Sequence, residues 1–499
     1  MNLSLALAEQ TQEYGNKVAQ ITSVPSSQNA PVKQQLPTET TEVITSNYVP
    51  DSFLVDEHDA MIADLIAEEH GENLLFDTTT KQWRVFSGGM WCEAEEAERM
   101  VWGFYCKVIL DINNQKYSRL LIGDPKWLKS AMNQSKASSA LKIVQVLTAK
   151  GAKSLDANPN LIGIQGMVYN IQHKGVRPAL ASDLIFKSLG TTHDSGALCP
   201  EWDKFLKTVM QEDQEMIDYL QRLVGYFLSA STQEQEIYYF YGSGANGKST
   251  FLDLIKTLLG SYGVKLSSDT FMRGKNGATS IGKQSSLANL EGARLAITDE
   301  TNDTDVSFDV QILKSISGDD EITARRLRHN PRTFKSTSKI VMYGNDKPHG
   351  NINDEGFWRR FRFIKFGYVV PDDERIDGLL DQLKVELPGI LNWALRGLED
   401  WHKNKMNTPQ KIRDESVDYR EELDTVSEFL VNNVAPAAGN IVPLVKLFED
   451  YAVWCSNNMK VAETKQAFSK RVKRYFETNK MATPHKTNKM RGYMGIKLA

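Results

Sequence analysis

Nine consecutive residues, from Gly242 to Thr250, have the types and spacing that hold a nucleoside triphosphate. Their order, GSGANGKST, fits the pattern G-x-x-x-x-G-K-[ST], whose glycines let backbone N–H groups turn toward phosphate oxygens. Lys248 would reach the terminal phosphates, and the Ser249 hydroxyl would bind Mg²⁺. A Gly-rich turn that binds nothing is the plain alternative. The stretch predicts ATP and Mg²⁺ as cofactors, with the nucleotide held by Gly242, Ser243, Gly244, Ala245, Asn246, Gly247, Lys248, Ser249 and Thr250.

A pair of acidic residues follows an apolar stretch downstream of this loop. Residues 290–298 are mostly apolar and lead into Asp299-Glu300, which is where a Walker B element belongs after a phosphate-binding loop. We predict that Asp299 helps to hold Mg²⁺ and that Glu300 polarises the attacking water.

A second polar residue stands at the end of the next predicted strand. Residues 339–343 read as a strand, and Asn345 follows closely. A polar side chain at a strand tip beside the γ-phosphate would orient the attacking water, which makes Asn345 the candidate sensor. A plain Asx turn before the following proline is the alternative.

Two segments concentrate cations without neighbouring acids. In residues 356–366, Arg359 and Arg360 are the candidates for an arginine finger that acts on the nucleotide of a neighbouring subunit. Between Arg325 and Lys339 there are six Lys and Arg residues and no acid, with a turn signal at Asn330-Pro331. We predict a hairpin that contacts DNA phosphates through Arg325, Arg326, Arg328, His329, Arg332 and Lys335. An ordinary solvated hairpin is the alternative.

The C-terminal part is also basic. From Lys465 onward there are ten Lys and Arg residues against one acid, Glu477. Helices followed by a short strand at the C-terminus predict a winged helix-turn-helix, with a recognition helix over 465–476. Lys470, Arg471, Lys473 and Arg474 on that helix are the candidate DNA contacts. A basic domain that docks another protein is the alternative.

The elements that must position these residues can be assigned in order. An apolar strand at 237–240 precedes the phosphate loop, and a helix at 251–259 follows it, with Gly260 as a stop signal. The expected domains are a flexible tail at 1–50, an α/β module at 51–199, a helical collar at 200–233, an ATPase domain at 234–400 and a C-terminal domain at 401–499. In the α/β module, 74–77 and 82–86 alternate like strands, and 87–89 reads as a turn before Met90-Trp91.

Composition limits the possible functions. A chain of 499 residues is long enough for several domains. Its net charge of −4 gives no global attraction to nucleic acid, so any such binding must come from local basic patches. The four cysteines form no C-x-x-C pair, which excludes a zinc ribbon and favours reduced thiols in a cytosolic compartment. No apolar run approaches a membrane span, and the N-terminal residues lack the basic start of a signal peptide, so neither is expected.

The order of these motifs resembles superfamily 3 helicases within the AAA+ class. It is most similar to the helicase part of phage and plasmid primase-helicases, the group related to the poxvirus NTPase. The matching stretches are 242–250, Asp299-Glu300, 314–319, Gly344-Asn345 and 358–360, and upstream 83–91, 199–202 and 220–226. The resemblance implies an α/β fold: a P-loop AAA+ core, a helicase-associated N-terminal domain and a winged-helix-like C-terminal domain.

This resemblance also implies a function and partners. It implies a ring, commonly a hexamer, with ATP between subunits and single-stranded or forked DNA in the central channel, moving 3′→5′. A mobile element replicating in the cytoplasm of a bacterial host is the expected source. Primase activity is not expected, because Asp303 and Asp305 lie inside the ATPase core and the acidic run 56–59 has no second cluster. A separate primase or replication initiator is an expected partner. Two other functions remain open: a replication initiator that binds an origin, and a double-stranded DNA translocase.

Overall fold

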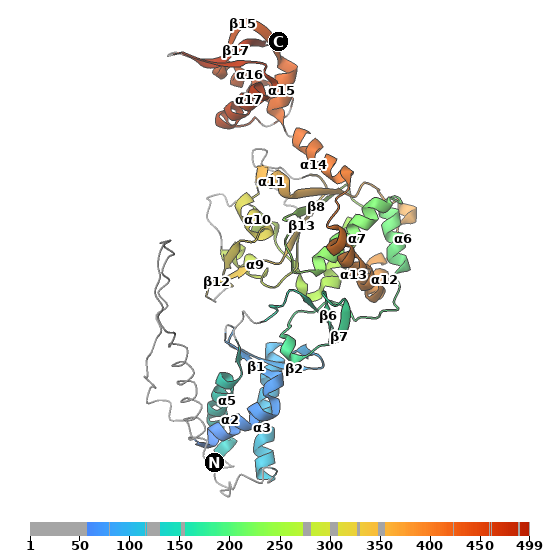
Figure 1. Cartoon of the computed structure of the whole chain (residues 1–499), viewed down its shortest axis with the longest axis vertical. Helices are drawn as coiled ribbons and strands as arrows, with labels where there is room; N and C mark the ends of the chain where they lie inside the picture. The colour runs from blue at the N-terminus through green and yellow to red at the C-terminus, as the bar shows by residue number, and fades with distance from the viewer. Residues whose placement is uncertain are drawn as a thin grey trace, which may run out of the picture. The chain divides into compact units, whose positions relative to one another are not determined.

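This computed structural model describes residues 57–78, 80–114, 116, 130–150, 155–272, 281–299, 308–326, 330–347, 355–422, 424–458, 460, 462–487 and 490–498. The predicted tail at 1–50 lies outside these residues, as do Glu300, Arg328 and His329. Figure 1 shows the elements along the chain. In this described part, no helix combines the length and the apolar character that crossing a membrane requires.

A parallel sheet of five strands forms the centre of the predicted ATPase domain, with strand order β14-β8-β13-β10-β9. Its strands are β8 (Ile237–Tyr241), β9 (Gly263–Lys265), β10 (Leu295–Asp299), β13 (Lys339–Gly344) and β14 (Phe361–Lys365). Every residue of β8 is buried, as expected for a parallel strand covered on both faces. The strands predicted at 237–240 and 339–343 are confirmed, and the apolar stretch at 290–298 becomes a strand only from Leu295.

Alternate residues of β8 enter two different hydrophobic cores, because successive side chains of a strand point to opposite faces. Tyr238 and Phe240 pack with α6 (Pro200–Val209), α7 (Gln214–Leu228), α8 (Lys248–Leu259), α12 (Leu379–Val385) and α13 (Leu387–Asn404). Ile237, Tyr239 and Tyr241 pack with residues of α9 (Ile281–Ala288), α10 (Val310–Ser317) and α11 (Glu355–Arg360). The sheet is therefore covered by helices on both faces.

The helical collar predicted at 200–233 is present as α6 and α7, and two buried cations hold the end of α7. Arg294 donates to the carbonyls of Leu228 and Leu161, the latter at 2.7 Å. Lys339 donates to the carbonyl of Ser229, and burial holds the pKa of Lys339 well below its usual range. Arg294 directly precedes β10 and Lys339 is the first residue of β13, so donors at the starts of two strands bind the carbonyls where the collar ends.

The N-terminal module packs α2 (Glu57–His70), α3 (Ala94–Asn113) and α5 (Gln134–Leu147) with a four-stranded sheet. The sheet has the order β3-β2-β1-β4 and contains β1 (Leu74–Asp77), β2 (Gln82–Ser87), β3 (Met90–Trp91) and β4 (Ala149–Lys150). The strands predicted at 74–77 and 82–86 are confirmed. A second, antiparallel sheet contains β5 (Leu161–Ile164), β6 (Met167–Asn170) and β7 (Gly175–Pro178).

The predicted basic hairpin is confirmed as β11 (Glu321–Ala324) paired antiparallel with β12 (Arg332–Lys335). The hydroxyls of Thr323 and Thr333 lie 2.9 Å apart across the two strands. Short 3₁₀ helices complete the described elements: η2 (Gly71–Asn73), η4 (Ala181–Asp183), η5 (Gly260–Tyr262), η6 (Ser268–Phe271) and η7 (Asp372–Glu374).

Helix α14 (Gln410–Glu422) leads from the ATPase domain into a small C-terminal domain. This domain contains, in order, α15 (Thr425–Asn433), β15 (Val434–Pro443), α16 (Leu444–Asn457), α17 (Lys465–Asn479), β16 (Thr483–Lys486) and β17 (Arg491–Leu498). Strand β17 lies between β15 and β16 in an antiparallel sheet. The helix predicted at 465–476 is α17, and the predicted C-terminal strand is β17.

Candidate nucleotide site and basic surfaces

Three adjacent strands, β8, β13 and β10, bring the predicted nucleotide residues to one edge of the sheet. Phe240 of β8 and Asp299 of β10 both pair with Tyr343 of β13. The carboxyl ends of parallel strands form the usual ligand crevice of an open α/β sheet. A cavity of about 350 Å³ lies here and is lined by Gly244, Ala245, Asn246, Gly247, Lys248, Ser249, Thr250, Asp299, Tyr343, Gly344 and Asn345. The loop, the acid and the candidate sensor therefore share one cavity.

Lys248 joins the phosphate loop to the end of β13. It is the first residue of α8 and is only 5% exposed. Its ammonium group donates to the carbonyl of Gly242 at 2.9 Å and to the carbonyl of Gly344. The exposed Ser249 follows at the N-terminus of the helix, where free N–H groups and the helix dipole favour an anion. This end of α8 is therefore suited to a phosphate group.

Two glycines of the loop are required by its geometry. Gly247 has a φ of 78°, and a Cβ atom there would lie 2.6 Å from Cγ1 of Val209 on α6. Gly242 has a φ of 144°, and its Cβ would lie 2.1 Å from the carbonyl oxygen of Phe366. Gly244, in contrast, has no atom within 4 Å of a Cβ. Glycine's conformational freedom is therefore needed at the two ends of the motif.

Asn246 has a structural task that the sequence did not indicate. It is 3% exposed, and its side-chain amide donates to the carbonyl of Phe366 at 2.9 Å. The backbone N–H of Lys248 donates to its side-chain oxygen at 3.3 Å. Close by, the backbone N–H of Val370 donates to the carbonyl of Ala245 at 2.9 Å. These contacts fasten the loop to the segment that follows β14.

Asp299 lies at the end of β10, and its side chain is 48% exposed. Lys265, at the end of β9, pairs with it at 3.2 Å, and this hydrogen bond raises the pKa of Lys265. Magnesium is usually held by one or two carboxylates together with substrate phosphates rather than by an all-protein cage. Accordingly, no group of three or more His, Cys, Asp or Glu residues in the described part could hold a metal, whereas Asp299 and Ser249 both line the cavity. These residues fit a phosphate-bound Mg²⁺.

Asn345 lies between the loop and the acid. Its exposed side chain borders the cavity, and its backbone carbonyl accepts the N–H of Gly242 at 3.2 Å. The start of the phosphate loop and the candidate sensor are thus joined directly through the backbone. Glu300, the predicted base, lies outside the described residues.

The two candidate finger arginines differ in exposure. Arg360 is 8% exposed, and it donates to the Ser317 hydroxyl at 3.1 Å and to the carbonyl of Gly356 at 3.2 Å. Arg359 is exposed and reaches the side-chain oxygen of Gln235 at 3.5 Å. Arg360 is therefore engaged inside its own subunit, and Arg359 is the arginine that faces outward.

The cations in and beside the hairpin also differ from one another, because some are paired with acids and others are not. Arg332 pairs with Glu291 at 2.8 Å, and Lys335 pairs with Asp319 at 2.9 Å. Arg325 and Arg326 are exposed and form no ion pair with the described residues. Two of the predicted DNA contacts, Arg332 and Lys335, are thus already paired with acids. Among the predicted contacts that the structure describes in this hairpin, Arg325 and Arg326 are the ones left without an acidic partner.

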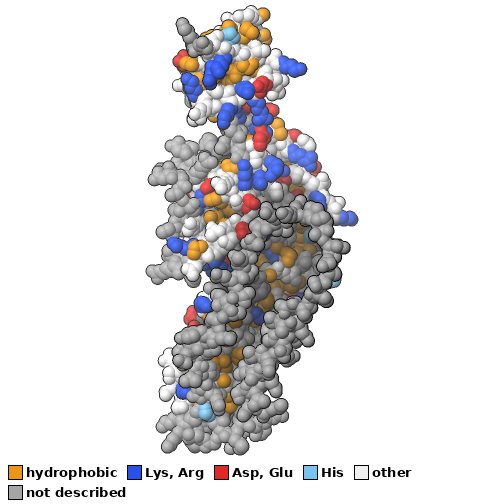
Figure 2. Space-filling view, turned by 60° about the vertical axis from the view of Figure 1, so that its left-hand side comes forward, with side chains coloured by type: hydrophobic (Ala, Val, Ile, Leu, Met, Phe, Trp, Pro, Cys, Tyr) orange, Lys and Arg blue, Asp and Glu red, His pale blue; other side chains and the backbone are white. Residues whose placement is uncertain are grey.

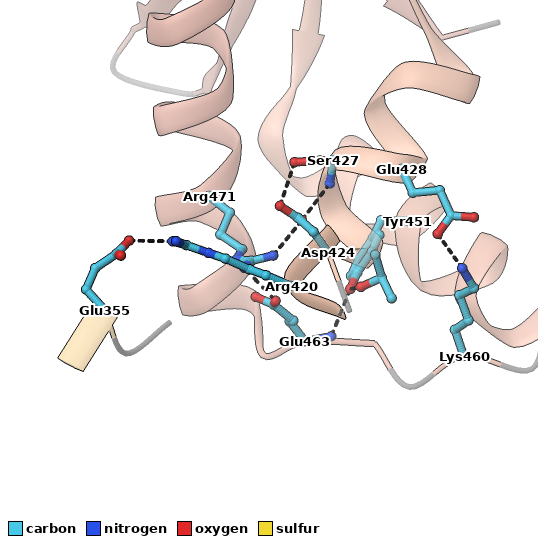
Figure 3. A network of polar contacts seen from close by, with 10 residues as sticks. Glu355, Arg420, Asp424, Ser427, Glu428, Tyr451, Lys460, Glu463 and Arg471 are labelled. Atoms are coloured by element: carbon cyan, nitrogen blue, oxygen red, sulfur yellow. Dashed lines mark hydrogen bonds and ion pairs between the residues drawn. The ribbon is translucent and has the colours of Figure 1, made fainter. Parts of the chain in front are cut away.

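On α17, Arg471 points into its own domain, where it pairs with Asp424 at 2.5 Å and Glu463 at 3.4 Å (Figure 3). Lys470, Lys473 and Arg474 are exposed, although Arg474 contacts Glu355 at 3.2 Å and Lys473 lies 3.7 Å from Glu477. Lys and Arg side chains appear on the visible surface of the C-terminal domain (Figure 2). Arg471 was predicted to contact DNA from the surface of the helix. In the structure, its ion pair with Asp424 anchors α17 to the start of α15.

Two stretches of the chain match protein families. Residues 63–211 match the family described as D5 N terminal like. Residues 240–360 match a family of unknown function, DUF5906. The first stretch contains most of the N-terminal module and α6, and the second extends from the phosphate loop to Arg360.

The curated relatives are viral proteins, and this chain spans about a third of their length. A protein of Acanthamoeba polyphaga mimivirus with a helicase name is 25% identical over 334 residues, which is 61% of this chain and 34% of that protein. An African swine fever virus protein with a primase name is 24% identical over 339 residues, or 62% and 34% of the two chains. A Frog virus 3 protein with a helicase name is 24% identical over 273 residues, or 51% and 28%. The similarity to viral proteins with helicase and primase names is thus confirmed.

Among solved structures, an apo structure of the NrS-1 C-terminal region is 10% identical, with a TM-score of 0.46 over 89% of this chain and 100% of that one.

Proposed function

We propose that this chain is an ATP-dependent DNA helicase of the AAA+ class, of superfamily 3 type, which replicates a phage, satellite or plasmid in the cytoplasm of a bacterial host. The observation that carries the proposal is the placement of Lys248, Asp299 and Asn345 around one cavity at the carboxyl edge of a parallel sheet. Similarity to viral proteins with helicase names adds support. The cofactors would be ATP and Mg²⁺.

Each residue of the cavity has a defined task in this proposal. The loop N–H groups and Lys248 hold the terminal phosphates, and Asp299 with Ser249 holds Mg²⁺, which neutralises charge on the phosphates. Asn345 orients the attacking water. Glu300, which the chain places directly after Asp299, accepts the proton of that water.

The exposure of Arg359 supports a ring. An outward arginine at the end of α11 can reach the nucleotide of a neighbouring subunit, where it would stabilise charge in the transition state. Hydrolysis would then require assembly, for which a hexamer is the proposed form.

Exposed cations supply the contacts with DNA. Arg325 and Arg326 next to the hairpin would grip the backbone of single-stranded or forked DNA in the ring, with 3′→5′ movement. The uncompensated charge of these two residues is the supporting observation. Priming would be left to a separate primase.

The test is the variant Lys248→Ala in the full chain. Loss of the ammonium group should reduce ATP hydrolysis and the unwinding of forked DNA by about a hundredfold or more. Asp253→Ala serves as the control, because Asp253 is an exposed residue of the same helix and does not line the cavity. Undiminished hydrolysis and unwinding in Lys248→Ala would refute the proposal.

A second candidate function, an ATP-regulated replication initiator, is favoured by the C-terminal domain. Its element order, with a helix pair before a β hairpin, supports a winged-helix assignment, and α17 would be the recognition helix. The exposed Lys470, Lys473 and Arg474 would contact DNA. The combined replacement of these three residues by Ala distinguishes the candidates: an initiator would lose sequence-specific binding, whereas a helicase without origin recognition would keep unwinding forked DNA.

A further inference from the structure

Helix α14 lies against β14, beside the nucleotide site. Tyr419 is buried, and its ring lies 5.1 Å from that of Phe363 and 5.8 Å from that of Trp358. The Ser416 hydroxyl donates to the carbonyl of Phe361 at 3.5 Å. These contacts dock the helix on the edge strand of the central sheet and on α11.

Glu415 of α14 contacts one residue next to each of two segments that border the cavity, 244–250 and 343–345. Its carboxylate accepts a hydrogen bond from the hydroxyl of Tyr241, the residue immediately before Gly242. The same oxygen lies 2.6 Å from the ammonium group of Lys347, two residues beyond Asn345. One side chain thus connects the start of the phosphate loop with the end of the sensor segment.

Lys347 is held between aromatic rings as well as by Glu415. Its ammonium group lies 4.9 Å from the ring centre of Tyr419 and 5.5 Å from that of Tyr241. Cations are attracted to the faces of aromatic rings, and more strongly where water is excluded. With only 13% of the Lys347 side chain and 24% of the Glu415 side chain exposed, this is a largely enclosed cluster. Glu422, the other acid near Lys347, is 3.6 Å away and 62% exposed.

The charged cluster is not what docking of α14 requires. Burial raises the pKa of Glu415, but hydrogen bonds from Lys347 and Tyr241 outweigh it, so the pKa is lowered and the carboxylate stays ionised at neutral pH. Removing two charges from water is costly, and apolar replacements of such pairs are often as stable. The aromatic contacts of Tyr419 already supply the docking. The position of the carboxylate, between the residue before the phosphate loop and the residue two beyond Asn345, therefore calls for an explanation beyond docking.

We propose that Glu415 is a positioning residue of the nucleotide site. By holding Lys347 and Tyr241 together, it fixes Asn345 relative to the phosphate loop, so that the attacking water meets the γ-phosphate in line. The inference rests on the proposed function. It also makes α14, which is followed by the C-terminal domain at Thr425, part of the hydrolytic machinery.

The experiment compares Glu415→Ala with Glu421→Ala in the full chain. Both variants remove one glutamate from α14, but Glu421 is exposed and forms no ion pair with the described residues. Glu415→Ala should lower kcat for ATP hydrolysis about tenfold and change the affinity for a non-hydrolysable ATP analogue less than about twofold, because the phosphate loop is intact. Glu421→Ala should change neither quantity by more than about twofold.

Two further variants separate positioning from folding. Glu415→Gln keeps the shape and the acceptor and removes only the charge, so it should fold normally and lose about threefold in kcat. Adding Lys347→Met to Glu415→Ala should cost less than about twofold more, since both residues act through one contact. Unchanged kcat in Glu415→Ala, or equal losses of kcat and nucleotide affinity, would overturn the inference.

The Lys248→Ala variant distinguishes this failure from failure of the proposed function. If the wild-type chain hydrolyses ATP and Lys248→Ala does not, the proposed function stands. The kcat and nucleotide affinity of Glu415→Ala then decide the role of Glu415. If Lys248→Ala hydrolyses ATP as well as the wild type, the nucleotide site is elsewhere, and both proposals fall.

Discussion

In the phosphate loop, the inward cation Lys248 is held by backbone carbonyls of Gly242 and Gly344, whereas in α17 the inward cation Arg471 is held by the carboxylates of Asp424 and Glu463. Every residue has a backbone carbonyl, so the acceptors for Lys248 depend on the course of the backbone and not on which side chains are present. Carboxylate acceptors must be supplied by particular side chains from other elements. The loop therefore depends on backbone geometry, and the basic helix depends on the identity of distant residues.

This difference explains why adjacent cations in the basic segments take opposite roles. Arg359 faces outward while Arg360 is buried, and Lys470 is exposed while Arg471 is paired inside its domain. A local excess of positive charge gives the same signal for both members of each pair. Only the partners on other elements decide which cation remains available to a ligand.

The largest expected effect comes from replacing the two arginines of α11, which tests whether the exposed or the buried one acts in hydrolysis. Arg359→Ala should reduce hydrolysis by the assembled protein about a thousandfold and leave the melting temperature unchanged, because its side chain is exposed. Arg360→Ala should destabilise the ATPase domain by about 2 kcal/mol, since it removes buried hydrogen bonds to Ser317 and Gly356. ATPase assays and thermal unfolding measure both. An inactive but fully stable Arg360→Ala, beside an active Arg359→Ala, would reverse the assignment.

A smaller effect is expected in the phosphate loop, where it tests whether ATP binding depends on the backbone geometry. Gly247→Ala should weaken ATP binding at least about tenfold, because a methyl group would meet Val209 at 2.6 Å and because a φ of 78° is strained for alanine. Gly103→Ala is the matched control, because Gly103 is exposed on α3, a Cβ there meets no atom within 4 Å, and the variant should bind ATP within about twofold of the wild type. Titration with a fluorescent ATP analogue measures both. Equal affinities for the two variants would mean that the loop adjusts freely and is not set by its backbone.

The arrangement of the candidate nucleotide site could be predicted largely from sequence because its signals are local. The strand before the loop, the glycines and the helix after it are contiguous, so their spacing alone defines the phosphate cradle. Asp299 and Asn345 could be found because each follows an apolar stretch that forms a neighbouring strand. The collar helices and the strands of the N-terminal module likewise follow from hydrophobic periodicity.

Long-range side-chain partners could not be predicted in this way. Lys265 pairs with Asp299 from a strand of three residues that carries no periodic signal. Glu415 meets Tyr241 across 174 positions of sequence, within a highly charged helix that reads as solvated. Such pairs are set by tertiary packing, and one sequence contains no local trace of them.

A moderate effect is expected in α17 of the C-terminal domain, where it tests whether Arg471 stabilises the fold and Lys470 binds DNA. Arg471→Ala should destabilise the C-terminal domain by about 2 kcal/mol, because Asp424 and Glu463 lose their shared cation in a partly buried site. Lys470→Ala should leave stability unchanged and weaken DNA binding severalfold at low salt, with a reduced salt dependence. Chemical denaturation and DNA titrations at two salt concentrations measure these effects. If Arg471→Ala weakens DNA binding without loss of stability, its inward ion pairs are not its main role.

The smallest expected effect concerns Glu355, which pairs with Arg420 at 2.5 Å and with Arg474 at 3.2 Å. These two hydrogen bonds hold the pKa of Glu355 below its ordinary value of 4.5. A depressed folded-state pKa contributes stability that is present above the ordinary value and is lost as pH falls through the folded-state value. Because the Glu355 side chain is 61% exposed, solvent screens the pairs, and the contribution should stay below about 1 kcal/mol.

The pH dependence of stability therefore distinguishes a cation that is held by carboxylates from one that is held by backbone carbonyls. The melting temperature of Glu355→Gln should lie slightly below that of the wild type at pH 7. The difference should shrink as pH falls below 4.5 and vanish once the pH is below the lower folded-state pKa, where the wild-type carboxylate is protonated. The difference between Lys248→Ala and the wild type should stay constant over the same range, since carbonyl oxygens do not titrate. If both differences change together with pH, carboxylates also govern the phosphate loop, and the distinction between backbone-held and carboxylate-held cations fails.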